Sequence, residues 1–172
     1  MASASPSRFH ATAALVLLLG MAATVGGALL FQHWGGYIPC ALCLEQRVPY
    51  YLGMPAAAAA LLGAVLHAPA ALTRTLLAVA GLLMLWGAYQ GAFHAGVEWG
   101  WWVGPTDCGA VAAPADTGGQ GVLDALDQVI PPSCDQAALR ILGLSLAGWN
   151  FLAALGLGLI ALWAAFRRPR AA

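Results

Sequence analysis

The sequence contains no lysine, and its charges amount to seven arginines and seven acidic residues in 172. Charged residues make up 8% of the chain, whereas soluble domains carry roughly 25%. This shortage excludes an ordinary soluble domain, and it excludes disorder, which requires abundant charge and few apolar residues. The net charge is zero, so no basic surface is available for nucleic acid. Apolar residues, at 61%, instead predict an integral membrane protein with a single domain spanning residues 1–172.

Four uncharged apolar segments are long enough to cross the hydrocarbon core, which takes about 20 helical residues. They cover residues 11–31, 48–66, 75–93 and 144–166. The first exceeds the apolar run of about 7–15 residues in a cleaved signal peptide, so we expect it to be retained. The segments predict an all-α, four-helix membrane bundle whose two outward loops span residues 32–47 and 94–140.

The arginines that flank these segments predict the orientation of the bundle. One side receives Arg8, Arg74, Arg167, Arg168 and Arg170. The other side receives every acidic residue: Glu45, Glu98, Asp107, Asp116, Asp124, Asp127 and Asp135. Because arginine flanking a span marks the cytoplasmic face, we expect both termini in the cytoplasm and both loops outside it.

All four cysteines fall in the two outward loops, where disulfides persist. Cys40 and Cys43 lie in the first loop, and Cys108 and Cys134 in the second. Five aromatic residues flank the same boundary, as expected of interfacial anchors: Trp34, Tyr37, Trp99, Trp101 and Trp102. Within the second loop, residues 122–130 show helical spacing of apolar residues and predict a short amphipathic helix.

The most informative motif is Cys40-Ala41-Leu42-Cys43, followed by Arg47. Two cysteines three positions apart can close and reopen a small disulfide ring. The pair precedes the second span, and the positive end of a helix dipole favours the thiolate form of cysteine. Arg47 is one helical turn beyond Cys43, where its charge would stabilise a Cys43 thiolate and its guanidinium could bind a carbonyl. The alternative for Arg47 is an interfacial anchor.

The second pair, Cys108 and Cys134, is separated by 26 residues in a loop rich in glycine and proline. It could be a structural disulfide that closes the loop, worth about 3 kcal/mol. Four cysteines allow three pairings, and the sequence does not choose among them. A zinc site would need a second closely spaced pair, which the chain lacks, so we expect no metal. A close pair and a distant pair on one oxidising face suggest disulfide exchange between them.

The run from Pro39 to Arg47, PCALCLEQR, resembles the signature of the DsbB family of bacterial disulfide bond formation proteins. The resemblance covers nearly the whole chain: four spans, the close pair in the first loop and the distant pair in the second. The segments 94–99 and 142–145 are also similar to stretches in family members. Together these features are specific, although Cys-x-x-Cys alone is not.

The resemblance implies an enzyme of the bacterial inner membrane that reoxidises a periplasmic DsbA-like thioredoxin-fold protein. It would pass the electrons to ubiquinone or menaquinone, in support of disulfide formation. The implied redox-active disulfides are Cys40–Cys43 and Cys108–Cys134. The partner would attack Cys108, Cys134 would bond to Cys40, and Cys43 would face the quinone as a thiolate near Arg47.

Two other function classes remain open. One is a different transmembrane thiol enzyme, such as a vitamin K epoxide reductase relative, although there the Cys-x-x-Cys follows the distant pair. The other is a non-enzymatic membrane protein with structural disulfides. Of the remaining polar residues, His94 and Glu98 could form a hydrogen-bonded pair, Gln90 could contact a ligand or a helix, and His67 is expected to have no chemical role.

Overall fold

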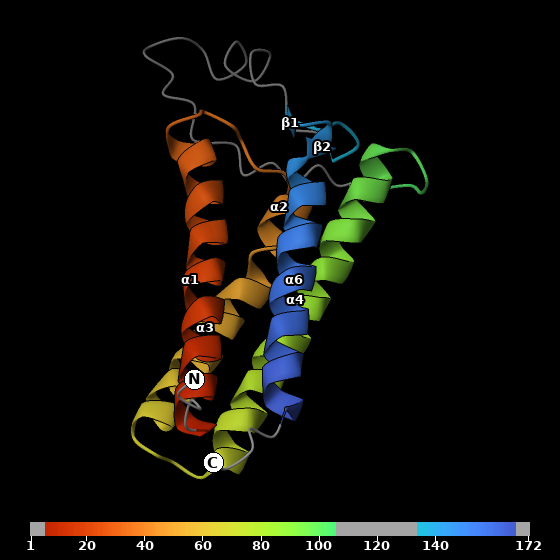
Figure 1. Ribbon diagram of the computed structural model, residues 1–172. Helices are drawn as coiled ribbons and strands as arrows, with labels where there is room; N and C mark the ends of the chain where they lie inside the picture. Colours follow the sequence, from red (N-terminus) through yellow and green to blue (C-terminus); the bar gives the residue numbers. More distant parts are fainter. Residues whose placement is uncertain (1–5, 106–133, 168–172) are drawn as a thin grey trace.

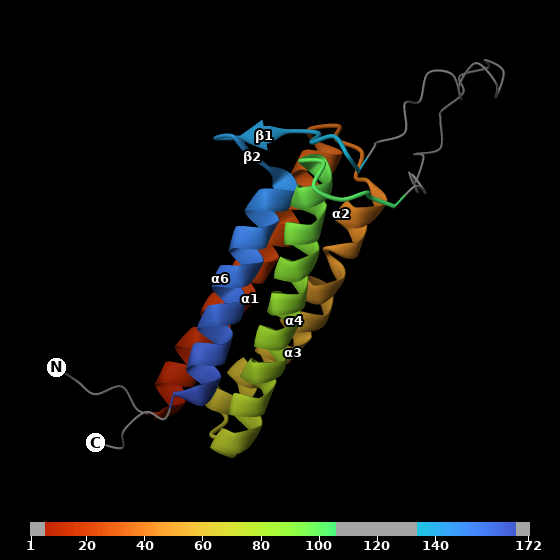
Figure 2. The same ribbon diagram turned by 90° about the vertical axis from the view of Figure 1, so that its right-hand side faces the viewer.

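The computed structural model describes residues 6–105 and 134–167. Four of its helices are long and apolar enough to cross a membrane, which confirms the predicted all-α membrane bundle. They lie side by side along one direction (Figures 1 and 2). The described elements are α1 (Pro6–His33), α2 (Ala41–Glu45), α3 (Val48–Val65), α4 (Ala70–Glu98), β1 (Arg140–Ile141), β2 (Leu144–Ser145) and α6 (Leu146–Phe166).

Burial in the bundle shows that its outer surface faces lipid. Small and medium apolar side chains fill the interior, with Leu17, Met21, Leu77 and Met84 fully buried. Many large apolar side chains point outward instead, and Leu19, Leu62, Leu82 and Leu159 are each more than half exposed. An apolar surface this extensive would be costly in water but is expected in hydrocarbon.

Helices α4 and α6 approach most closely, because small residues line their contact. A Cβ added at Gly91 would lie 2.8 Å from the backbone nitrogen of Phe151. Lower in the bundle, a Cβ on Gly158 would lie 3.3 Å from the Gly81 carbonyl oxygen. Small residues at such crossings allow backbones to approach, which is the main source of helix association in lipid. This contact fixes α4 against α6 near the functional end.

The helical path between α2 and α3 is interrupted by a proline. Pro49 has no backbone N–H and therefore cannot continue the hydrogen-bond ladder from α2, but it fits the first turn of a new helix. The chain accordingly ends α2 at Glu45, turns through Gln46 and Arg47, and restarts at Val48. This break gives the Cys-x-x-Cys motif a helical turn of its own.

The outer end of α4 is closed by glycine. Gly100 has φ +71°, and the N–H of Trp101 donates to the Gly96 carbonyl at 2.9 Å, as in a Schellman cap. The chain then folds back so that Trp102 stacks on Phe93 with 5.8 Å between ring centroids. Gly96 provides the space, since a Cβ there would overlap the Trp102 ring.

Arg8 near the start of α1, Arg74 near the start of α4 and Arg167 after α6 lie at one end of the bundle, whereas Arg47 before α3 and Arg140 on β1 lie at the other (Figure 1). Arg74 Nε donates to the Ala165 carbonyl at 2.6 Å, which joins the start of α4 to the end of α6. The Arg167 guanidinium lies 4.7 Å from the Trp163 ring centroid. The motif Cys-x-x-Cys and the two short strands lie at the opposite end. This separation is consistent with the predicted orientation.

Two segments differ from the sequence-based expectation, and a third cannot be compared with it. Helix α4 continues to Glu98, so His94 lies inside the helix and not in the second loop. Residues 144–145 form strand β2, paired with β1, and α6 begins at Leu146 after Ser145 accepts a capping hydrogen bond from Gly148. The amphipathic helix expected over residues 122–130 lies outside the described residues.

We predict that Gly91→Ala destabilises the bundle by about 1–3 kcal/mol, because the added methyl group overpacks the α4–α6 contact. The measurement is the thermal unfolding midpoint of detergent-solubilised protein. Gly156→Ala is the matched control, since nothing lies within 4 Å of a Cβ there; this change should be neutral or slightly stabilising. Equal midpoints for the two variants would contradict the proposed close contact.

Candidate functional site

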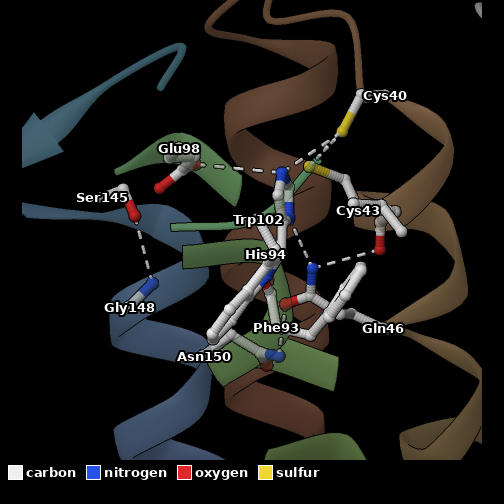
Figure 3. Close-up of polar contacts among 11 residues, drawn as sticks. Cys40, Cys43, Gln46, Phe93, His94, Glu98, Trp102, Ser145, Gly148 and Asn150 are labelled. Carbon is white, nitrogen blue, oxygen red and sulfur yellow. Dashed lines mark hydrogen bonds and ion pairs between the residues drawn. The ribbon is translucent and has the colours of Figure 1, made fainter. Parts of the chain in front are cut away.

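The close cysteine pair is placed by the first turn of α2. Cys40, with extended backbone angles, is the N-cap residue of this helix, and Cys43 lies at its third position. Their sulfur atoms are 3.1 Å apart, with the Cys40 thiol donating to Cys43 Sγ (Figure 3). A disulfide bond is about 2.05 Å long, so no bond joins the two sulfurs here, and they lie close enough to form one.

The two thiols of this pair are not equivalent. Donation to Cys43, followed by burial, raises the pKa of Cys40 to about 12. The same hydrogen bond stabilises negative charge on the acceptor, so the thiolate of the pair belongs on Cys43. The sequence analysis expected a helix dipole to stabilise the thiolate of this pair. The helix concerned is α2, which has only five residues. The neighbouring thiol is therefore the larger influence on Cys43.

Cys134 enters the same site from the segment that precedes β1. It is buried, and its sulfur lies within 4.8 Å of both Cys40 Sγ and a ring nitrogen of His94. Burial raises the pKa of this thiol. Cys40 from the close pair and Cys134 from the distant pair thus lie next to each other. Cys108, the fourth predicted site residue, lies outside the described residues.

His94 connects the cysteines to the bundle interior. The ring is 3% exposed, with Nε2 3.7 Å from Cys40 Sγ and 3.9 Å from Glu98 Oε1. Its Nδ1 lies 2.7 Å from Gln46 Nε2. His94 and Glu98 thus lie next to each other, but 3.9 Å is too long for the hydrogen bond that their spacing suggested; the histidine also faces the Cys40 sulfur.

Three polar residues in this region were not identified from the sequence. Gln46 Oε1 accepts from Asn150 Nδ2 at 2.7 Å, and Asn150 Oδ1 accepts from the Tyr50 hydroxyl at 2.7 Å. Figure 3 shows Gln46 between His94 and Asn150. Asn150 was detectable in principle, because it is the one amide side chain in the apolar run of residues 146–166. Gln46 was obscured by the more conspicuous Arg47 beside it.

A cavity of about 350 Å³ opens next to the cysteine pair, between α1, the α2–α3 turn and the start of α6. Its walls are mainly apolar, and they include Val25, Phe31, Leu146 and Trp149. Its polar lining residues are Thr24, Gln32, Tyr37, Cys43, Gln46, Arg47, Tyr50 and Asn150. Apolar walls with a few polar groups are typical of a small-molecule site.

Arg47 contributes to this cavity from the turn before α3. Its guanidinium donates to Gln32 Oε1 on α1 at 2.8 Å, which holds it on the cavity wall. Both Arg47 and Cys43 line the cavity, whereas Cys40 is not among the lining residues. Arg47 and Cys43, which the sequence predicted to be neighbours, therefore line the same cavity.

Cys40, His94 and Cys134 have the donor atoms and spacing that a soft metal ion would accept. Two of the three are cysteines that approach one another across two loops, one of them part of a Cys-x-x-Cys pair. The sequence analysis expected no metal because the chain lacks a second closely spaced cysteine pair. The structure nevertheless brings these three donors together, so the absence of a metal stays a prediction.

Two other predicted residues contribute less. Gln90 Oε1 is buried without a hydrogen-bond partner among residues 6–105 and 134–167. His67 has φ +58° and ends α3, where the N–H of Ala68 donates to the Gly63 carbonyl at 2.8 Å. The role of His67 is thus a helix cap.

Comparison with known proteins assigns the chain to a family. A family model described as disulfide bond formation protein DsbB matches residues 10–164. The chain belongs to the DsbB family. Disulfide bond formation protein B of Saccharophagus degradans is 32% identical over 165 residues, which cover 90% of this chain and 92% of that relative. No solved structure matches the chain. As a member of the DsbB family with four membrane-spanning helices, the chain is a multi-pass membrane protein of disulfide bond formation.

We predict that Cys43→Ala shifts alkylation of Cys40 to lower pH in the fully reduced protein. The neighbouring sulfur holds the proton on Cys40 and raises its pKa to about 12, so removing this sulfur lowers the pKa. The measurement is the pH dependence of iodoacetamide labelling at Cys40, followed by mass spectrometry. Glu45→Gln, an exposed change on the same helix, should leave the profile in place. An unchanged profile in Cys43→Ala would show that the sulfur contact does not control Cys40.

Proposed function

We propose that this chain oxidises the dithiol of a periplasmic thioredoxin-fold protein of the DsbA kind and passes the two electrons to a membrane quinone. The observation that carries the proposal is the division of the cysteine pair between two environments. Cys40 faces Cys134 and His94, while Cys43 lines an apolar cavity with Arg47. One side of the pair therefore meets thiols, and the other meets a compartment suited to a lipid-soluble oxidant.

On the thiol side, electrons would move by thiolate attack on disulfides. A partner thiolate attacks Cys108 of a Cys108–Cys134 bond and releases Cys134 as a thiolate. Cys134 then attacks Cys40 of the Cys40–Cys43 bond, which forms a Cys40–Cys134 bond and leaves Cys43 as a thiolate. The partner's second thiolate displaces Cys108 as the partner's own disulfide closes. Cys108 then attacks Cys134, which restores the Cys108–Cys134 bond and leaves Cys40 and Cys43 as the dithiol that a quinone would oxidise. The burial that raises the pKa of Cys134 increases the intrinsic nucleophilicity of its thiolate but also makes it a poorer leaving group.

On the cavity side, the residues present fit a quinone ring. The walls supplied by Val25, Phe31 and Trp149 suit a flat apolar ring, and the cavity volume of about 350 Å³ is within the range of small-molecule sites. Arg47, fixed by Gln32, presents guanidinium donors that can bind a carbonyl oxygen. A quinone accepts two electrons and two protons, which matches the oxidation of one dithiol. The chain does not distinguish ubiquinone from menaquinone.

We further propose that the bundle resides in the bacterial inner membrane with the cysteines on the periplasmic side. Arg8, Arg74 and Arg167 flank the spans at one end, as expected for a cytoplasmic face. Cys40, Cys43 and Cys134 are at the other end, where the oxidising periplasm would keep disulfides formed.

We predict that Arg47→Ala weakens quinone binding about tenfold to hundredfold, since a charge-assisted hydrogen bond contributes about 1.5–3 kcal/mol. Arg47→Lys should recover part of this, because a point charge restores attraction without the planar fork. The measurement is steady-state quinone reduction by solubilised protein, with reduced partner in excess and quinone varied.

Arg140→Ala serves as the control, because Arg140 is exposed on β1 away from the cavity lining. It should leave the quinone KM unchanged. If Arg47→Ala also leaves that KM unchanged while lowering the amount of inserted protein, Arg47 is an interfacial anchor and the binding role is wrong.

We predict that Cys134→Ala traps a mixed disulfide between Cys108 and the partner, formed when the Cys108 thiolate attacks the disulfide of the oxidised partner and releases one of its two sulfurs as a thiolate. Without Cys134, neither the return attack on Cys108 nor the exchange with Cys40 can occur, so the intermediate accumulates. Non-reducing gels and mass spectrometry of the linked peptides identify the joined cysteines. Linkage through Cys40 or Cys43 would reverse the assigned order, and no linkage in any cysteine variant would favour structural disulfides.

A further inference from the structure

We propose that Gln46, held by Asn150 and Tyr50, is a positioning residue that fixes His94 as the Nε2–H tautomer, so that His94 donates a hydrogen bond to Cys40. This role rests on the thiol exchange proposed above. It adds Gln46, Asn150 and Tyr50, which disulfide exchange among the cysteines does not itself require. Its basis is a chain of buried and half-buried hydrogen bonds that links α3, α6, the α2–α3 turn and α4.

The orientation of the Gln46 amide determines the direction of this chain. Gln46 Nε2 lies 3.1 Å from the Leu42 carbonyl oxygen, which can only accept a hydrogen bond. The amide nitrogen must therefore point to this side, and the amide oxygen points to Asn150. The second N–H of the same nitrogen is directed to His94 Nδ1 at 2.7 Å.

The tautomer of His94 follows from this geometry. Because Gln46 presents a donor, His94 Nδ1 must be the unprotonated acceptor, and the proton of the neutral ring resides on Nε2. That N–H faces Cys40 Sγ at 3.7 Å and Glu98 Oε1 at 3.9 Å. His94 is therefore a donor to the Cys40 sulfur and cannot accept its proton through Nε2.

Asn150 and Tyr50 help to keep the Gln46 amide from turning over. Gln46 Oε1 accepts from Asn150 Nδ2, which leaves Asn150 Oδ1 to accept from the Tyr50 hydroxyl. Rotating the Gln46 amide alone would oppose two N–H groups at Asn150 and two carbonyl oxygens at Leu42. If Asn150 rotated as well and donated to the Tyr50 oxygen, the mismatch at Leu42 would remain, so the Leu42 carbonyl fixes the direction and Asn150 and Tyr50 reinforce it.

Among residues 6–105 and 134–167, the groups that face His94 are the Glu98 carboxyl on its own helix, the Cys40 and Cys134 thiols, and the neutral amide of Gln46. A donor directed at Cys40 stabilises the thiolate there whenever an exchange opens a disulfide at this sulfur. The hydrogen bond would thus assist the sulfur whose other contact, with Cys43, favours the protonated form.

The direct test is the ring ¹⁵N spectrum of His94 in the reduced full-length protein, labelled with [¹⁵N]histidine in detergent micelles and assigned with His94→Asn. We expect a protonated Nε2 and an unprotonated Nδ1. A protonated Nδ1 in the neutral ring would overturn the proposal without any variant being needed.

Variants test whether Gln46 is the cause. Gln46→Leu and Asn150→Asp should both convert the His94 signal to a mixture of tautomers, although Asn150 does not touch the ring. Both should also slow alkylation of Cys40 at fixed pH by about tenfold, since the thiolate loses its donor. Simple loosening of the bundle would instead expose Cys40 and accelerate labelling.

Gln90→Leu is the matched control, because it removes a buried glutamine from α4 one turn before His94 without touching the chain of hydrogen bonds. It should change neither the ¹⁵N signal nor the labelling rate. An unaltered tautomer in Gln46→Leu would refute the positioning role. Neither measurement uses quinone or partner, so failure here and failure of the proposed electron transfer are separable.

Discussion

The side chain of Gln46 is the point at which three separate segments of the bundle are joined. Its amide contacts His94 on α4, Asn150 on α6 and the Leu42 carbonyl of α2. Membrane helices lack a hydrophobic drive to associate with one another, so hydrogen bonds and close backbone contacts determine which faces meet. The small-residue contact at Gly91 brings α4 and α6 close enough for one glutamine to bond to both helices. The environment of Cys40 depends on this contact between α4 and α6.

A helical break allows Gln46 to occupy this position. If α2 and α3 formed one continuous helix, the residues after Cys43 would follow the helical ladder. Pro49 prevents this by removing the donor that would continue it, and the chain turns at Gln46 and Arg47. The two residues of that turn have separate partners: Gln46 contacts His94 and Asn150, while Arg47 bonds to Gln32 on α1. The break therefore positions Gln46 on the thiol side of the site and Arg47 on the cavity side.

The sequence was sufficient for the bundle because apolar run length and the scarcity of charge are direct consequences of the bilayer. It also identified the cysteine pair and Arg47, whose spacing is local. It did not reveal the contact of His94 with Cys40, which are 54 positions apart and meet only through the packing of α4. It placed the end of the third span at residue 93, because His94 and Glu98 read as loop residues when their burial is unknown. Gln46 and Asn150 lacked any local pattern, since a hydrogen bond between residues 104 positions apart leaves none.

The cost of an unpaired polar group in a membrane bundle explains the positions of Gln46, Asn150 and His94. A buried amide or imidazole in a membrane bundle is costly unless each donor and acceptor is paired, so such residues are usually functional. Here Gln46 uses its amide oxygen and both N–H groups, and Asn150 pairs its nitrogen with Gln46 and its oxygen with Tyr50. The series ends at the sulfur of Cys40, which is not a strong hydrogen-bond acceptor as a thiol but is one as a thiolate. The hydrogen bond from His94 stabilises negative charge on that sulfur, and it partly offsets the contact with Cys43 and the burial that together raise the pKa of Cys40.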